Sequence, residues 1–189
     1  MSYRNKTIMT WTTKFDTNLA ATTNVYFGVP ADNTNFLDWD NYVVGDIPAA
    51  GSTLSPAGAG TSSLLKWESP ANMAQFVAPI NCRLVAISYA LDMSNPANGT
   101  THVRIGAMAD RDFSDEDSRT ENATWTSLGY IDTTTMTGDP AGQVQKGSAQ
   151  FSSSNGDVSA GQCVGAILES FGAGGGAISG IITMTFEGS

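Results

Sequence analysis

Hydrophobic and polar residues alternate with a period of two along several stretches of the chain, and few windows space apolar residues as a helix would. The clearest alternation runs from Cys82 to Asp92, where four large apolar residues share one face: Val85, Ile87, Tyr89 and Leu91. The opposite face is flatter because its side chains are small: Ala86, Ser88 and Ala90. This pattern predicts a β-strand with one buried face.

A second strand is predicted from Thr101 to Ala109. Its inward-facing residues are Val103, Ile105 and Ala107. The loop 93–100 separates the two strands and contains Asn98-Gly99, a residue pair favoured where the backbone needs a positive φ. We therefore expect the two strands to form a hairpin.

Six more strands are predicted, which brings the expected total to about eight: Thr22–Val29, Asn72–Ile80, Ala123–Ile131, Ser148–Ser152, Gln162–Phe171 and Ile178–Glu187. The last strand has one fully apolar face, made by Ile178, Ile182, Met184 and Phe186. Its other face mixes Ile181 with serine and threonine, so this strand can lie between a core and a neighbouring surface. The pattern predicts an all-β, antiparallel sandwich.

Two segments lie outside this regular pattern. Residues 32–70 form the longest stretch without a clear strand, and an irregular loop of that length in a compact domain is expected to be functional or packed on a neighbour. Residues 1–21 are expected to form an N-terminal docking arm, leaving 22–189 as the domain. The arm alternates like a strand, so it can add to a sheet edge elsewhere. The predicted docking side chains are Ile8, Met9 and Trp11.

The length and charge narrow the possible partners. A chain of 189 residues with 41% hydrophobic residues fits one domain with a sizeable core. Its 9 basic and 18 acidic residues give a net charge of −9, and the basic residues are scattered from Arg4 to Lys146. This scatter argues against nucleic acid and against an anionic membrane surface as partners. No transmembrane or secretory segment is recognisable, so folding in a cytoplasm is expected.

The two cysteines, Cys82 and Cys163, are therefore predicted to be free and buried, because cytosolic thiols are kept reduced. A disulfide is the alternative. A metal site has less support, because two isolated cysteines and one histidine do not make a ligand cluster.

The inventory of catalytic groups is small, and the chain is predicted not to be an enzyme and to need no cofactor. His102 is the only histidine, and its place on a strand opposite the inward residues predicts a surface or interface position. No nucleophile motif accompanies it. The glycine run 172–176 lacks the following helix and lysine of a phosphate-binding loop, so it predicts a loop between the last two strands.

The acidic segment 110–121 resembles a calcium-binding loop in its spacing. Oxygen-bearing residues stand at five ligand positions: Asp110, Asp112, Ser114, Ser118 and Glu121. Asp115 occupies the position that needs glycine for the sharp turn, and the flanking segments predict strands rather than helices. A solvated acidic loop is therefore the favoured interpretation, with calcium binding as the alternative.

Aromatic residues near carboxylates suggest a second kind of site. Trp39 and Tyr42, with Asp38 and Asp40 close by, have the composition of a platform that stacks on a sugar and hydrogen-bonds its hydroxyls. The competing interpretation places these aromatic residues in the core or in a subunit interface.

The segment 81–187 resembles the jelly-roll domains of bacteriophage virion proteins and, more distantly, tumour-necrosis-factor-like and complement-like trimers. The resemblance rests on the strand 82–92 after Ala78-Pro79-Ile80, on the turn 158–162 leading into the strand 164–168, and on the closing strand 181–186. Many such turns have an acidic residue where this chain has Gln162. The resemblance implies an antiparallel β-sandwich of jelly-roll type, often trimeric, that binds proteins or sugars.

On this resemblance the chain is expected to be a phage capsid decoration or head-fibre subunit on the virion exterior, assembled in the host cytoplasm. The expected partners are a major capsid protein or other virion protein, contacted through the arm and the long loop, and sister subunits in a homotrimer. The trimer interface is predicted at Val164, Ala166 and Leu168, whose apolar face needs a cover. The alternative is a receptor-binding tail-fibre head or lectin-like adhesin that recognises host glycan.

Overall fold

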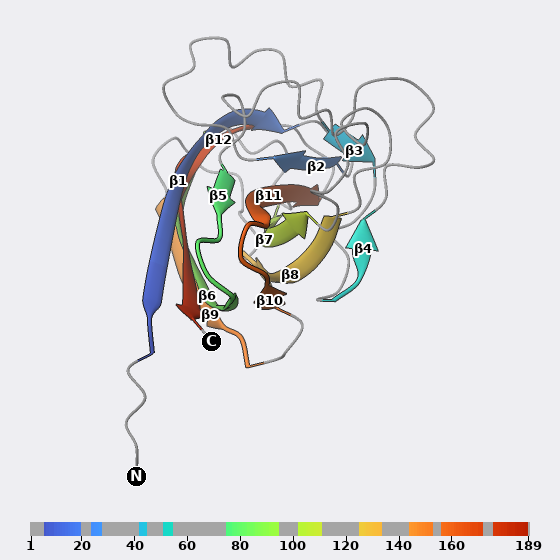
Figure 1. The fold of residues 1–189 in the computed structure, drawn as a ribbon. Helices are drawn as coiled ribbons and strands as arrows, with labels where there is room; N and C mark the ends of the chain where they lie inside the picture. The colour runs from blue at the N-terminus through green and yellow to red at the C-terminus, as the bar shows by residue number, and fades with distance from the viewer. Residues whose placement is uncertain are drawn as a thin grey trace.

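The computed structural model describes residues 6–19, 24–27, 42–44, 51–54, 75–94, 102–110, 125–133, 144–152, 156–171 and 176–188. The regular elements in these segments are all β-strands (Figure 1). None of the described residues form a helix that is long and apolar enough to cross a membrane.

The strands form two antiparallel sheets. Sheet A contains β1 (Ile8–Leu19), β12 (Gly176–Gly188) and β6 (Cys82–Ser94) in that order, and the far edge of β6 pairs with β9 (Val144–Gln150) and the short β10 (Asp157–Val158). Sheet B runs in the order β3 (Tyr42–Val44), β2 (Asn24–Phe27), β11 (Cys163–Phe171), β7 (His102–Asp110), β8 (Trp125–Asp132) and β4 (Thr53–Leu54). A further strand, β5 (Gln75–Val77), also pairs with β11.

The main pairings are nested, which defines the topology. The outermost pair is β1 with β12, followed inward by β2 with β11, β6 with β9, and β7 with β8. Such nesting is a long hairpin rolled over on itself, so that four of these strands fall in each sheet, as in a jelly roll. The predicted fold class, an all-β antiparallel sandwich of jelly-roll type, is confirmed.

The predicted hairpin between the strands 82–92 and 101–109 is wrong. β6 pairs with β12 and β9 in sheet A, whereas β7 pairs with β11 and β8 in sheet B. The chain therefore passes from one sheet to the other between these strands. Alternation reports which face of a strand is buried, but it carries no information about the strand's partner.

The first strand also differs from its prediction. β1 pairs with β12 along its whole length, from Ile8 opposite Glu187 to Leu19 opposite Gly176. Residues 8–19 are thus an edge strand of the sandwich itself rather than part of a separate arm at 1–21. The strand finds its sheet edge within its own chain, where β12 would otherwise carry unpaired backbone groups.

The long segment 32–70 contains two short strands that its composition does not predict. β3 extends sheet B beyond β2, and β4 pairs with β8 through Thr53 and Leu54. Apart from Gly51 and Ser52, which lead into β4, the rest of this segment lies outside the described residues.

Both sheets turn apolar residues toward one shared core. The inward residues predicted for β7 and β12 are all fully buried: Val103, Ile105, Ala107, Ile178, Ile182, Met184 and Phe186. β6 departs from its predicted alternation because a bulge skips Val85, so that Ala86 faces Thr185 and Leu84 faces Phe186. Leu84 therefore takes the inward position that the sequence pattern assigns to Val85.

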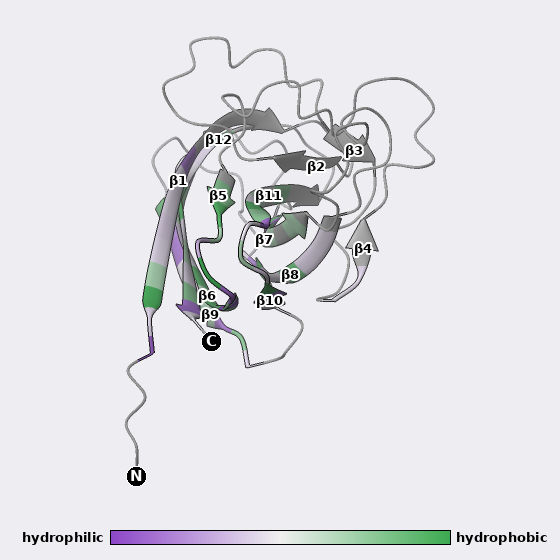
Figure 2. Cartoon of the chain, in the orientation of Figure 1, coloured by the Kyte–Doolittle hydropathy of each residue, from purple (hydrophilic) through white to green (hydrophobic). Residues whose placement is uncertain are grey.

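An aromatic cluster links β1, β5 and β12. Phe76 stacks on Phe186 with 5.3 Å between ring centroids, and Trp11 lies 6.5 Å from Phe76. Met9 and Trp11 are half-buried against the core. Figure 2 shows β1 as mostly pale, with one hydrophobic stretch near its start. β1 is therefore held by packing as well as by its backbone hydrogen bonds.

Candidate interaction surface

The outward side of sheet A is a broad surface on which serine and threonine are the most numerous residues, and we call it the hydroxyl face. Its residues are all exposed or half-buried: Ile8, Thr10, Thr12, Lys14, Arg83, Ala86, Ser88, Ala90, Asp92, Val144, Lys146, Ser148, Gln150, Ser179, Ile181, Thr183, Thr185 and Glu187. Successive strands contribute side chains at the same level, because the four strands share a continuous register.

The middle of this face is a row of four hydroxyl side chains that crosses the sheet from edge to edge: Thr12, Thr183, Ser88 and Ser148. The Thr12 and Thr183 hydroxyls lie 3.0 Å apart and share a hydrogen bond. Serine, threonine and alanine lose little conformational freedom when they are covered. This face is therefore suited to close contact with another protein surface.

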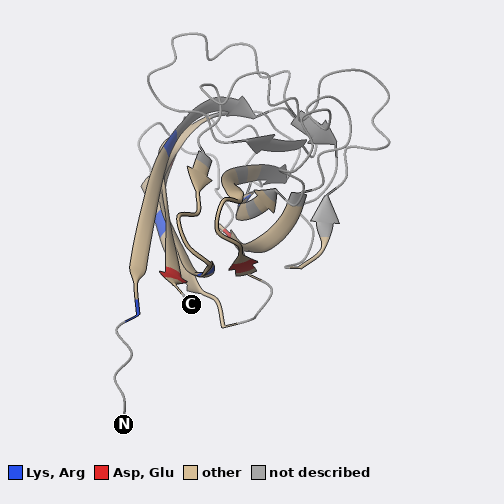
Figure 3. Ribbon diagram, in the orientation of Figure 1, with Lys and Arg blue, Asp and Glu red and all other residues tan. Residues whose placement is uncertain are grey.

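Charge on this sheet is balanced, unlike charge on the rest of the chain. Lys6 and the strands of sheet A carry four basic and four acidic residues, and the remainder of the chain carries five basic and fourteen acidic residues, which accounts for the net −9. Figure 3 shows these few charges dispersed along otherwise uncharged strands. A sheet with so little net charge on an acidic protein is the part that a second acidic surface approaches with least repulsion.

Three of the five charged residues of the hydroxyl face lie toward its two ends, and the other two, Lys14 and Lys146, lie on its edge strands. At one end, Glu187 contacts Lys6 and lies 3.7 Å from an Arg83 guanidinium nitrogen. At the other end lies Asp92, between Ser179 and Val144 in the register. Arg83 Nε and Asp92 Oδ1 are both buried, with no hydrogen-bond partner among the described residues. Buried unpaired polar atoms are uncommon and call for an explanation.

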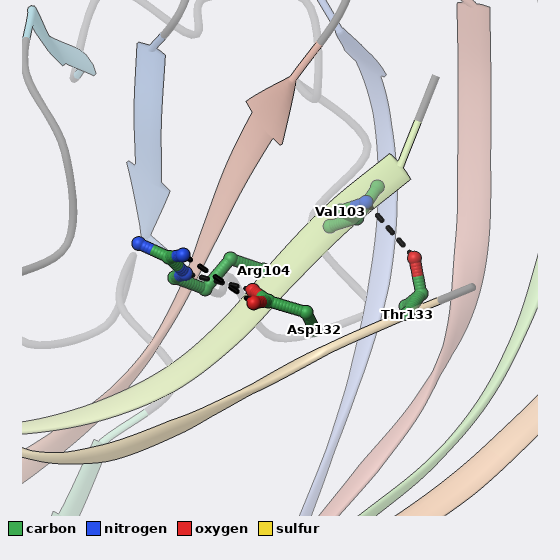
Figure 4. A network of polar contacts seen from close by, with 4 residues as sticks. All are labelled: Val103, Arg104, Asp132 and Thr133. Atoms are coloured by element: carbon green, nitrogen blue, oxygen red, sulfur yellow. Dashed lines mark hydrogen bonds and ion pairs between the residues drawn. The ribbon is translucent and has the colours of Figure 1, made fainter. Parts of the chain in front are cut away.

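The outward side of sheet B carries a more specific polar arrangement (Figure 4). Arg104 donates two hydrogen bonds to Asp132, from Nε to Oδ1 at 2.7 Å and from Nη2 to Oδ2 at 3.3 Å. The Arg104 guanidinium also lies 4.0 Å from the centre of the Tyr130 ring. These contacts hold the arginine side chain flat against the sheet. Its donors are therefore engaged within the chain, and this arrangement is structural.

The turn that leads into β11 is fixed by side-chain hydrogen bonds. Ser159 N donates to Gln162 Oε1 at 2.7 Å, and Ala160 N donates to Asn81 Oδ1 at 2.9 Å. Gly161 takes the positive φ of 87° that the turn requires. Gln162 thus supplies the side-chain acceptor oxygen that closes the turn.

The predicted docking residues divide between the two faces of β1. Ile8 is 57% exposed on the hydroxyl face, as a docking role requires. Met9 and Trp11 pack against the core of their own chain, so their assignment to docking is wrong. The reason is geometric: neighbouring residues on a strand point to opposite sides of the sheet.

The predicted trimer interface is also wrong. Val164, Ala166 and Leu168 are fully buried in the core of a single chain, between sheets A and B. Sheet A already covers the apolar face of β11, so no second subunit is needed to cover it. The homotrimer itself stays a prediction without these residues to support it.

Most of the other predicted site residues fall where the structure gives no side-chain description. Asp112, Ser114, Ser118 and Glu121 of the calcium hypothesis, and Asp38, Trp39 and Asp40 of the glycan hypothesis, lie outside the described residues. Asp110 and His102 lie at the ends of β7, and Tyr42 begins β3. The described residues contain no group of three or more His, Cys, Asp or Glu that could hold a metal ion.

Both cysteines are buried, as predicted, and neither takes part in a disulfide. Burial raises the pKa of the Cys82 thiol, which keeps it protonated and unreactive at neutral pH. Cys82 is therefore a core residue rather than a nucleophile.

The hydroxyl face as a unit is not among the predicted sites, although part of its signal is present in the sequence. The small residues between 85 and 91, and the mixed outer positions of the strand 178–187, mark two of its four strands. The contributions of β1 and β9, and the charged pair Arg83 and Asp92, become apparent only from the strand order.

No family model matches the chain, and no curated protein matches it. Among solved structures, the chain is similar to a chain from the structure of the Gx strain of infectious bursal disease virus, with 12% sequence identity and a TM-score of 0.35. The match covers 96% of this chain and 32% of the viral chain, so this chain spans about a third of the length of its structural neighbour.

Proposed function

We propose that the protein is a non-enzymatic structural subunit of a virus particle, and specifically a bacteriophage capsid decoration or head-fibre subunit on the particle exterior. One observation carries the proposal: a four-stranded hydroxyl face with only three basic and two acidic residues lies on a jelly-roll chain whose net charge is −9. Jelly rolls are a common architecture of viral capsid domains. The partners in this proposal are copies of the chain and a capsid protein.

The composition of the hydroxyl face favours protein contact over catalysis or small-ligand binding. Interface cores are depleted of charged residues, because each charge must lose its water on contact. The middle of this face contains no charge, and its hydroxyls pair with one another or with a partner's backbone. It is also a continuous sheet surface rather than the concave site that a small ligand needs.

The proposal is tested by assembling particles with a variant that places a charge in the middle of the face. Thr183→Lys should reduce the copies of the protein per particle by about tenfold or more, because a buried unpaired charge costs several kcal/mol. Ala160→Lys, on an exposed turn outside the face, is the matched control and should be incorporated normally.

Copy number and adhesion decide between the proposed function and the adhesin alternative. A decoration subunit should be present in numbers comparable to the capsid protein, and its loss should lower particle stability without changing host-cell binding. A few copies per particle, together with loss of glycan or cell binding on deletion, would replace this proposal with the adhesin. Absence of the protein from purified particles would overturn both.

A further inference from the structure

We propose that the hydroxyl face binds the hydroxyl face of a second copy of the chain, in a two-fold dimer whose axis lies in the interface and crosses the strands at the row of Ser88 and Thr183. The inference rests on the proposed function only in taking this face to be a protein contact. It requires no virus particle, so it is tested on the purified chain alone.

The size of the face is adequate for such a dimer. Three strands with ten residues each and β9 with seven, spaced about 4.8 Å apart with a rise of about 3.4 Å per residue, cover about 600 Å² per copy. Two copies would then bury about 1,200 Å² in total, at the lower end of the range of specific protein interfaces. Two sheets packed face to face also accommodate each other's twist, as the layers of a sandwich do.

The positions of the charges favour one of the two possible symmetric arrangements. A level of the face is a row of residues that lie opposite one another across the four strands. If the axis runs along the strands, each level meets the same level of the other copy, but the strand order is reversed, so β1 lies over β9 and β12 lies over β6. Lys14 on β1 then lies opposite Lys146 on β9, since both stand at the level of Ile181 and Ala90. This arrangement also places Glu187 opposite Arg83 of the other copy, but Glu187 already contacts Lys6 within its own chain. Like charges meet at both edges of the interface, which is unfavourable.

If the axis crosses the strands, each strand meets its own counterpart with the levels reversed. Arg83 and Asp92 stand at opposite ends of β6, on either side of Ser88. The axis at Ser88 therefore places Asp92 of each copy opposite Arg83 of the other, and each lysine opposite a neutral residue: Lys14 opposite Thr10 and Lys146 opposite Gln150. Both charges of β6 then gain an opposite charge, whereas Glu187 on β12 lies opposite Ser179 and keeps its contact with Lys6.

This arrangement also gives partners to two side chains that are incompletely paired within one chain. Arg83 reaches Glu187 only at 3.7 Å, and both Arg83 and Asp92 are half-buried, so part of each side chain is open to a second copy. A pair across the two-fold axis would use this exposed part of each side chain. Because the dimer contains the pair twice, a single substitution affects both ends of the interface.

Charge reversal followed by mixing tests this arrangement, with native mass spectrometry and sedimentation velocity as readouts. The wild-type chain should be a dimer. Asp92→Arg and Arg83→Asp should each weaken dimerisation by about tenfold or more, because each homodimer then opposes like charges at two places. An equimolar mixture of the two variants should form a heterodimer, since every arginine then faces an aspartate.

Lys14→Glu distinguishes the two symmetric arrangements. It should change the dimer affinity less than threefold in the proposed dimer, but it should strengthen a dimer whose axis runs along the strands, where it would face Lys146. Thermal unfolding of each variant shows whether the chain still folds. A monomeric or trimeric wild type, or the absence of a heterodimer from folded variants, would overturn the inference. If the dimer is overturned but the Thr183→Lys variant is still not incorporated into particles, the proposed function stands and the hydroxyl face binds a different partner.

Discussion

At the scale of single residues, buried polar groups show how the sandwich completes its hydrogen bonds where a strand ends. Thr133 follows the last residue of β8 and is only 6% exposed. Its backbone N donates to Val103 O at 2.8 Å, and its Oγ1 accepts a hydrogen bond from Val103 N at 2.9 Å (Figure 4). One residue thus satisfies both backbone groups of Val103 on β7.

Thr133→Val should therefore lower the free energy of unfolding by about 1–3 kcal/mol, because it removes the acceptor of a buried N–H group while keeping the side-chain shape. Thr133→Ser keeps the hydroxyl and should cost about 1 kcal/mol or less, for the lost methyl group. Urea unfolding of both variants measures the difference. Equal costs would show that the hydrogen bond contributes nothing.

Two buried acidic groups should make the fold sensitive to alkaline pH. Burial raises the pKa of Cys82 above its ordinary value of 9.0 and the pKa of Tyr89 above 10.0. Above about pH 9, the unfolded chain therefore releases protons that the folded chain retains, so stability falls as pH rises. Below that pH both groups are protonated in both states and contribute nothing to the dependence.

The measurement is the thermal midpoint between about pH 8 and pH 11 at constant ionic strength. The double variant Cys82→Ala, Tyr89→Phe should start from a lower midpoint, because it loses packing, but its midpoint should decline less steeply with pH. The slope is the informative quantity, since the other tyrosines and cysteine are the same in both proteins. An unchanged slope would contradict the assignment.

At the scale of elements, β1 belongs to the folded body, and its two faces should respond differently to substitution. Trp11 packs toward Phe76 and the core, whereas Thr10, its neighbour along the strand, is exposed on the hydroxyl face. Trp11→Ala should therefore destabilise the chain by about 2–4 kcal/mol, and Thr10→Ala by less than about 0.5 kcal/mol. Denaturant titration measures both values, and similar values would show that β1 does not pack on the core.

The same alternation explains how much of the fold the sequence predicts. It correctly identifies the inward residues of β7 and β12, because burying one face of a strand imposes a period of two on its sequence. It fails at Val85, where a bulge changes the phase, and at the predicted hairpin, because every strand offers the same backbone hydrogen-bonding groups. Which strands pair depends on how the whole chain folds, and a short stretch of sequence carries no information about that.

The candidate surface is predictable only in part, for a related reason. The outer residues of β6 and β12 are small or hydroxyl-bearing in the sequence, which indicates two flat faces. That these faces are neighbours follows from the pairing of residues far apart along the chain, such as Thr183 with Thr12. The interface predicted at Val164 and Leu168 fails because an apolar face on a strand looks the same whether its own second sheet or another subunit covers it.

At the scale of the whole molecule, the uneven charge distribution should control self-association. For two chains of net charge −9 with centres about 30 Å apart, the unscreened repulsion in water is about 10 kcal/mol. Salt shortens the screening length from about 30 Å at 0.01 M to about 8 Å at 0.15 M. This repulsion greatly exceeds the roughly 1 kcal/mol expected from each exposed ion pair.

Dimer affinity should therefore increase when NaCl is raised from about 0.01 M to about 0.15 M, although salt also weakens the contact between Arg83 and Asp92. Sedimentation equilibrium at several salt concentrations measures this dependence, and sodium sulfate at matched ionic strength separates screening from ion-specific effects. A decrease in affinity over this range would show that local ion pairs outweigh the overall repulsion.

The nested pairing also determines when this protein can fold during its synthesis. β1 is made before the other described strands, yet its partner in sheet A is β12, so Ile8 has no Glu187 to pair with until β12 has emerged from the ribosome. At typical rates of about 5–20 residues per second, the stretch from β1 to β12 takes about 10–40 s to make. Throughout that time Trp11 and the backbone of β1 lack their native cover, so β1 must wait for β12 before sheet A can be completed.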